Sequence, residues 1–201
     1  MKALIIVDVQ NDFLPGGALA VPGGDAIVPV VNRLLPDFPL IVATQDWHPA
    51  DHGSFAANHP GRQPFEQIDL HGLPQTLWPV HCVQNTGGAC FAPGLETRPI
   101  HRIFFKGTDA RVDSYSGLFD NGRRNSTGLA EYLHTKGVTD VSVCGLATDY
   151  CVKFTALDAL REGFRVTLIE DACRGVNLRP GDVEKAVEEM RAVGATIGTS
   201  A

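Results

Sequence analysis

The sequence predicts an α/β protein: a three-layer α/β/α fold with a doubly wound, mainly parallel sheet. Short runs rich in β-branched residues alternate with helical patterns along the whole chain. Several of these runs are continuously apolar, which is typical of parallel strands covered by helices on both faces. The 201 residues suffice for one domain with a substantial core. A repeated β-α-β order with right-handed crossovers is the arrangement that these observations favour.

Five segments are expected to be strands and four to be helices. The expected strands are Ala3–Val7, Leu40–Thr44, Arg102–Phe105, Asp140–Cys144 and Arg165–Ile169. The expected helices are Ala26–Leu35, Ser126–Thr135, Tyr150–Glu162 and Pro180–Val193. Glycines at 137 and 163 fit helix ends, and Pro180 fits a first helical turn.

Residues 46–100 depart from this alternation. They hold five of the seven histidines, both tryptophans and many prolines and glycines. An irregular segment of this length in a compact domain is usually functional or disordered, and its histidines and aromatic residues favour function. We therefore expect one domain over residues 1–201, with an irregular insertion that carries a metal site at about 46–100.

Composition and charge exclude several function classes. A net charge of −6 without a Lys/Arg cluster argues against a nucleic-acid partner. No apolar run approaches the ~20 residues of a membrane span. The start of the chain does not resemble a signal peptide, because its apolar run is short and leads into Asp8. Five irregularly spaced cysteines indicate reduced thiols and a cytoplasmic location.

The segment Gly145–Cys151 places a cysteine between an apolar strand and a helical pattern. Free backbone N–H groups and the helix dipole at such a junction stabilise a thiolate and a developing oxyanion. A buried structural cysteine is the alternative, and the local sequence leaves both interpretations open.

Four reactive side chains follow expected strands: Asp8, Asp46, Lys106 and Cys151. Ligands of open α/β sheets bind beyond the carboxyl ends of the strands, so these residues should converge. A lysine beside the thiol would favour thiolate, and a carboxylate could take its proton and return it to a departing amine. A strand-end cap at Asp8 and a solvated Lys106 are the alternatives.

A second group consists of Asp46 and His48 with the nearby His52, and of His81, which the segment Trp78–His81 would bring in from farther along the chain. Residues two apart on an extended segment point the same way and can chelate one ion. An Asp-His-His set from Asp46, His48 and His81 suits one divalent metal ion, with zinc expected first and iron or manganese as alternatives. Histidines that are merely hydrogen-bonded in a polar loop are the competing interpretation.

Apolar and aromatic side chains could form a flat pocket for an aromatic ring. The expected substrate-binding residues are Phe13, Leu19, Trp78, Tyr115 and Leu146. Ordinary packing is the alternative for each of them taken singly.

Together these segments resemble the nicotinamidases of the isochorismatase-like cysteine hydrolase superfamily. The resemblance rests on Ile5–Phe13, Thr44–Pro49, Leu77–Val83, Phe105–Gly107, Asp113–Ser116 and Gly145–Cys151, in the expected order along the chain. It implies the isochorismatase-like hydrolase fold.

The resemblance also implies roles for the residues. Cys151 would be the nucleophile, Asp8 the general base and acid, and Lys106 the residue that holds the thiolate and orients Asp8. Asp46, His48 and His81 would bind the metal together with waters. A cis peptide bond would join Leu146 to Ala147 and aim the N–H groups of Ala147 and Cys151 at the oxyanion.

The implied activity is the hydrolysis of nicotinamide to nicotinate and ammonia in NAD salvage, with the metal on the pyridine nitrogen. We expect pyrazinamide to be hydrolysed as well, and the resemblance allows a homo-oligomer. One alternative is another hydrolase of this superfamily that acts on a different small amide or ureido compound. The alternative from another class is a catalytically silent metal-binding or thiol redox protein.

Overall fold

A six-stranded parallel sheet forms the centre of the computed structural model, which describes residues 1–200. Its strands are β1 (Lys2–Val7), β2 (Ile41–Asp46), β5 (Arg102–Lys106), β6 (Asp140–Leu146), β7 (Arg165–Arg174) and β8 (Thr196–Gly198). Their order across the sheet is β5-β2-β1-β6-β7-β8, and each neighbouring pair is parallel. Strands β1 and β2 are almost wholly buried; the apolar sequence of β1 predicts this, whereas β2 ends in three buried polar residues, Thr44, Gln45 and Asp46.

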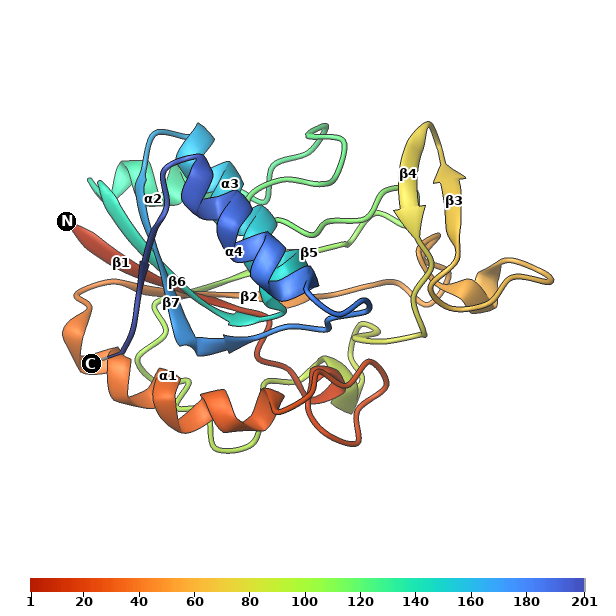
Figure 1. Cartoon of the computed structure of the whole chain (residues 1–201), viewed down its shortest axis with the longest axis horizontal. Coiled ribbons are helices and arrows are strands. Elements are labelled where there is room, and N and C mark those ends of the chain that lie inside the picture. The colour runs from red at the N-terminus through yellow and green to blue at the C-terminus, as the bar shows by residue number, and fades with distance from the viewer. Residues whose placement is uncertain (201) are drawn as a thin grey trace.

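Helices cover both faces of the sheet. The α-helices are α1 (Val28–Leu34), α2 (Leu129–Thr135), α3 (Lys153–Arg161) and α4 (Asp182–Ala192). Helix α1 lies on one face and the other three lie on the opposite face (Figure 1). Short 3₁₀ helices span Asn11–Phe13, Gly24–Ile27, Leu35–Asp37, Ala56–Asn58 and Gly87–Ala89. The three-layer, doubly wound fold predicted from the sequence is therefore confirmed.

The predicted helix starts are the least accurate part. Helix α4 begins after Gly181, whose φ of 92° is left-handed, so Pro180 precedes the helix and is not in its first turn. Helix α2 likewise begins after Gly128, with φ 84°, and is shorter than predicted. A single π-helical turn, Thr148–Val152, precedes α3 and contains Cys151. The nucleophile candidate thus lies in the first turn of a continuous helical segment.

The irregular stretch contains an antiparallel hairpin that the sequence patterns did not predict. Strands β3 (Gln67–Leu70) and β4 (Leu73–Thr76) pair only with each other and lie apart from the main sheet (Figure 1). The two turn residues, His71 and Gly72, both have positive φ, 52° and 87°. Positive φ at both positions is the mark of the tight turn whose twist suits a hairpin.

The order of the strands fixes the place of the site. From β1 the chain adds β2 and β5 on one side, and it then adds β6, β7 and β8 on the other side. Ligands of such sheets bind at the switch point between the two halves, which here lies between β1 and β6. Asp8 follows β1 directly, Asp46 and Lys106 are the last residues of β2 and β5, and Cys151 follows β6. The four side chains predicted to converge therefore leave one edge of the sheet.

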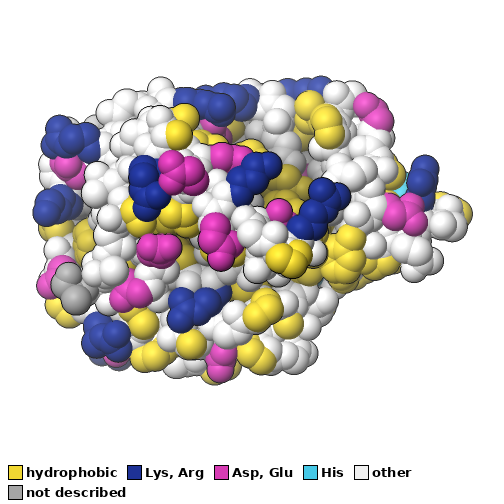
Figure 2. Space-filling view, in the orientation of Figure 1, with side chains coloured by type: hydrophobic (Ala, Val, Ile, Leu, Met, Phe, Trp, Pro, Cys, Tyr) yellow, Lys and Arg dark blue, Asp and Glu magenta, His cyan; other side chains and the backbone are white. Residues whose placement is uncertain are grey.

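The surface carries charges of both signs. Figure 2 shows Lys/Arg and Asp/Glu side chains interspersed on one face of the molecule. Among residues 1–200, no helix is long and apolar enough to cross a membrane.

Candidate active site and metal centre

A buried lysine, Lys106, contacts two other predicted site residues, Asp8 and Cys151. The Nζ atom of Lys106 lies 2.9 Å from Oδ2 of Asp8 and 3.3 Å from Sγ of Cys151. It also donates to the carbonyl oxygen of Ser114 at 2.9 Å. An Asp8 carboxylate oxygen and the Cys151 sulfur lie within 4.8 Å of each other. The predicted convergence of acid, lysine and thiol is present in the structure.

The position of Asp8 makes it a strong base for a carboxylate. Its backbone has a φ of 47°, a strained conformation for a non-glycine residue and one that clusters at functional sites. The hydroxyl of Thr44 donates to Asp8 Oδ1 at 2.6 Å. Burial, assisted by the Asp46 charge, raises the pKa of Asp8 despite Lys106 and Thr44. A raised pKa favours proton transfer from a thiol to this carboxylate.

The protonation of Cys151 differs from the expectation of a thiolate at a helix start. Burial raises the pKa of Cys151 well above its ordinary value, and the Asp8 and Asp46 charges add to this, against Lys106. Burial alone would lower the pKa of Lys106, but Asp46 and Asp8 raise it well above its ordinary value. The resting pair is therefore a thiol beside an ammonium group, and the thiol needs a base to react.

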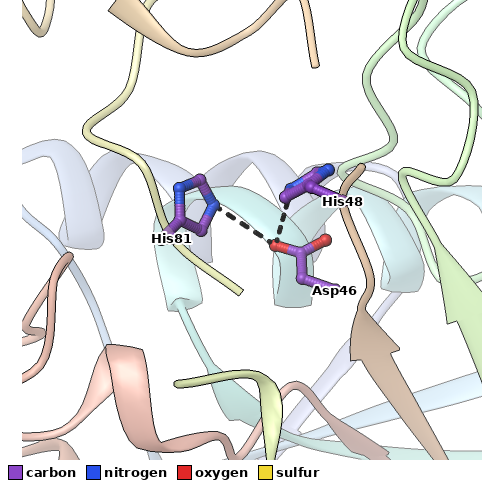
Figure 3. A group of neighbouring side chains, drawn as sticks. All are labelled: Asp46, His48 and His81. Atoms are coloured by element: carbon purple, nitrogen blue, oxygen red, sulfur yellow. Dashed lines mark ion pairs between the residues drawn. The ribbon is translucent and has the colours of Figure 1, made fainter. Parts of the chain in front are cut away.

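The predicted metal ligands form a compact group in the same site. Nε2 of His48 and Nε2 of His81 lie 3.6 Å and 3.7 Å from the same oxygen, Oδ2 of Asp46. Figure 3 shows both rings directed at this carboxylate. All three side chains are buried. Two imidazole nitrogens and one carboxylate oxygen at this spacing form a donor set for a divalent metal ion with open positions.

Backbone carbonyl groups orient both histidine rings. Nδ1 of His48 lies 2.9 Å from the carbonyl oxygen of Gly107, and Nδ1 of His81 lies 2.8 Å from that of Pro79. A carbonyl oxygen only accepts hydrogen bonds, so each Nδ1 carries the hydrogen. Each Nε2 lone pair is then free to coordinate, as in metal-binding histidines whose other nitrogen is held by a partner. The residues present therefore fit a metal ion.

His52, the fourth candidate, lies beside the three ligands. Its ring centroid is 4.3 Å from that of His48, and its Nδ1 lies 2.7 Å from Oγ of Ser54. Its Nε2 is buried without a hydrogen-bond partner among the described residues. His52, His48 and Asp113 form a second group of potential ligand atoms within 4.8 Å of one another.

A small, partly open cavity of about 30 Å³ joins the two groups of residues. Its lining includes Phe13, Leu19, Trp78 and Tyr115, the four predicted ring contacts, together with Asp46, His48, His81, Ala147 and Cys151. The lining does not include Leu146, whose side chain is fully buried in the core. The Leu146–Ala147 peptide bond is cis, as the resemblance implied.

Three further lining residues were not selected from the sequence: Asp113, Tyr150 and Val176. Tyr150 directly precedes Cys151, and Asp113 is the first residue of the Asp113–Ser116 motif, so their places in the sequence could have indicated that they lie at the site. Val176 reaches the cavity from the loop after β7, where no motif marks it. Its backbone N–H donates to Asp149 at 2.9 Å, which holds that loop against the turn that contains Cys151.

Comparisons with known proteins agree with this geometry. Residues 2–201 match the model of the isochorismatase domain. The chain is 53% identical to a nicotinamidase of Escherichia coli over 100% of this chain and 95% of that protein. A nicotinamidase and pyrazinamidase of Acinetobacter baumannii superposes with a TM-score of 0.96 at 48% identity, covering 99% of this chain and 96% of that one. The pyrazinamidase of Pyrococcus horikoshii in complex with zinc gives a TM-score of 0.81 at 44% identity, covering 98% of each chain. The chain belongs to the isochorismatase domain family.

Proposed function

We propose that this chain hydrolyses nicotinamide to nicotinate and ammonia and thereby serves NAD salvage. The observation that carries the proposal is a cavity lined both by Cys151 and by the Asp46-His48-His81 group, with Lys106 in contact with Cys151 and with Asp8. A thiol with its base and a metal-type donor set suits a small amide that carries a ring nitrogen. Relatives with matching sequence and fold are nicotinamidases.

Cys151 is the nucleophile of a two-stage reaction. Asp8 takes the thiol proton while the sulfur attacks the carboxamide carbon, and the C=O electron pair moves to oxygen. The N–H groups of Ala147 and Cys151 stabilise this oxyanion. The C–N bond then breaks, and ammonia leaves with the proton that Asp8 returns. A thioester remains on Cys151.

Water completes the cycle. Asp8 takes a proton from the water molecule as its oxygen attacks the thioester, and the C–S bond breaks to release nicotinate and the sulfur of Cys151, which regains its proton. Lys106 remains charged throughout, because two carboxylates raise its pKa. Its ammonium group, 3.3 Å from the sulfur, stabilises negative charge there while the thiol is deprotonated.

Asp46, His48 and His81 would hold the metal ion, which we propose to be zinc, with iron or manganese as alternatives. When bound, the ion supplies a Lewis-acid centre that holds the ring nitrogen of the substrate. Zinc is supported by the zinc-bound pyrazinamidase of P. horikoshii. Phe13, Leu19, Trp78 and Tyr115 enclose the ring. Pyrazinamide, which also has ring nitrogens, is a second substrate of this site.

The cellular setting follows from the thiols and the substrate. All five cysteines are free, which suits the reducing conditions of the cytoplasm. The partner is a small molecule, and a homo-oligomer is compatible with the fold.

Ammonia release from nicotinamide by metal-analysed protein tests the reaction. Cys151→Ala should lose nearly all turnover while keeping its metal and fold, whereas Cys90→Ala, at an exposed thiol, should keep its activity. Appreciable turnover by Cys151→Ala would overturn the mechanism. A panel with pyrazinamide, carbamoyl amines and ureido compounds separates this function from that of other amidohydrolases.

Metal analysis tests the ligand set separately. His48→Ala should lower the metal content, because one of three ligands is lost. His134→Ala is the matched control. This histidine lies in α2, away from the site, where its ring stacks on that of Phe164. Normal metal stoichiometry in His48→Ala would refute its role as a ligand.

A further inference from the structure

A buried glutamine on the β3–β4 hairpin contacts the wall of the cavity from outside. Gln75 lies in β4 and is only 2% exposed. Its Nε2 atom lies 2.8 Å from Oδ2 of Asp113 and 3.2 Å from the hydroxyl oxygen of Tyr115. Both of these residues line the cavity, but Gln75 does not. The hairpin therefore reaches the binding site through one side-chain amide.

The surroundings of Gln75 fix the orientation of its amide group. Asp113 offers only acceptors as a carboxylate, and its other oxygen already accepts the N–H of Ser114 at 2.8 Å. The carbonyl oxygen of Thr76, 2.8 Å from Nε2, is also an acceptor. A reversed amide would set its own oxygen 2.8 Å from two groups that can only accept, the Asp113 carboxylate and the Thr76 carbonyl oxygen. Gln75 therefore acts as the donor that joins Asp113 to Tyr115.

Tyr115 is held from a second side as well. Nε1 of Trp78 donates to the same Tyr115 oxygen at 3.2 Å, so two N–H groups meet one hydroxyl. The Trp78 and Tyr115 rings pack edge to face with centroids 6.3 Å apart. Gln75 and Trp78 together fix the angle at which the Tyr115 ring faces the cavity. A buried network of this kind specifies one arrangement when each of its members is satisfied.

We infer that Gln75 is a positioning residue for substrate binding, which acts by holding Tyr115 and Asp113 in the cavity wall. The inference rests on the proposed function, because it names what places the wall that encloses the substrate ring. Gln75 makes no hydrogen bond to Asp8, Lys106 or Cys151 among the described residues. Its loss should therefore weaken substrate binding and leave the chemistry at the sulfur largely intact.

The first test is Gln75→Leu, which keeps the size of the side chain and removes its hydrogen bonds. KM for nicotinamide should rise by about tenfold, the effect of losing a hydrogen bond to a charged partner, while kcat changes by less than about threefold. The matched control is Gln67→Leu on the same hairpin, whose amide donates to Oγ1 of Thr76 at 2.7 Å. Its KM should stay near that of the wild type.

A double-mutant cycle with Tyr115→Phe tests whether Gln75 acts through the Tyr115 hydroxyl. Tyr115→Phe keeps the ring and removes the shared oxygen, so its KM should rise as well. The double variant should raise KM by less than the product of the two single effects, because both changes break one network. A full product would overturn the inference, as would an unchanged KM in Gln75→Leu.

Three outcomes remain distinct. If the wild type releases no ammonia from nicotinamide, the proposed function fails. If the wild type is active while Gln75→Leu keeps its KM, or raises KM no more than Gln67→Leu, only the inference fails. If Gln75→Leu does not fold, Tyr115→Phe decides, and an unchanged KM in that variant refutes the positioning network.

Discussion

Replacing Thr44 with valine should shift the pH dependence of turnover without disturbing the fold. The Thr44 side chain is fully buried on β2, and its hydroxyl donates to Oδ1 of Asp8 at 2.6 Å. Valine has nearly the same shape but no hydroxyl. The change therefore removes one hydrogen bond from Asp8, the proposed general base, and leaves its contact with Lys106, at 2.9 Å, in place.

The sign and size of the effect follow from this hydrogen bond. The hydrogen bond from Thr44 lowers the pKa of Asp8, against the larger opposing effect of burial. Without it, the pKa of Asp8 rises further, so the acid limb of the kcat/KM profile moves to higher pH. A hydrogen bond to a charged group contributes about 1.5–3 kcal/mol, which corresponds to a fall of tenfold or more in kcat/KM on the acid side. Above the shifted limb, the variant should approach the rate of the wild type.

The assay is ammonia release from nicotinamide over roughly pH 5 to 9, because the pKa values of catalytic acids and bases lie near the operating pH of an enzyme. Thr44→Ser is the control, because it keeps the hydroxyl and should keep the position of the acid limb. The reasoning is refuted if the Thr44→Val profile superimposes on that of the wild type. It is also refuted if Thr44→Ser is displaced as far as Thr44→Val.

Three further predictions concern other parts of the chain. Gly107→Ala should lose metal and activity, because φ is +64° and a Cβ there would overlap the ring of His48; unchanged metal content would contradict this. Iodoacetamide at neutral pH should label the exposed Cys90 but not Cys173, since burial raises the pKa of Cys173 to about 12, and mass spectrometry reads out both sites. Hydrogen bonds from Arg165 lower the pKa of Asp140 to about 2. The contribution of this pair to stability is therefore present above the ordinary pKa of an aspartate, near 4, and is lost as the pH falls toward 2. Urea unfolding should accordingly show that the stability gap between the wild type and Asp140→Asn narrows through that window, and a constant gap would argue against the pair.

The sheet could be predicted from the sequence because parallel strands that are buried on both faces have nearly continuous apolar sequences. The five expected strands are all present, and each begins within one residue of its predicted start. Their ends were less predictable: β7 continues to Arg174 through polar residues, beside a shift in its register with β6. Strand β8 has only three residues, too few for a periodic pattern. Pairing with a neighbour defines such segments, and pairing is a tertiary property.

The central residues of the site could be predicted for a different reason. Asp8 and Lys106 stand at strand ends and Cys151 in the turn that follows a strand, and the topology of a parallel sheet gathers such residues at one edge. Side chains that reach the site from elsewhere left no such signal. Val176 enters from a loop after β7, and Gln75 acts from a separate hairpin. The protonation of Cys151 was also beyond the sequence, because it depends on burial and on two carboxylates brought together by folding.

One carboxylate belongs to both halves of the site. Asp46 directs Oδ2 at the two histidines and Oδ1 at Lys106, 2.5 Å away. The candidate metal-binding group and the proposed catalytic group therefore share one residue. Replacing Asp46 would therefore remove a charged neighbour of Lys106 as well as a candidate metal ligand, whereas replacing a histidine would leave the contact with Lys106 in place. Engineering this scaffold toward amides without a ring nitrogen should therefore begin at the histidines and keep Asp46.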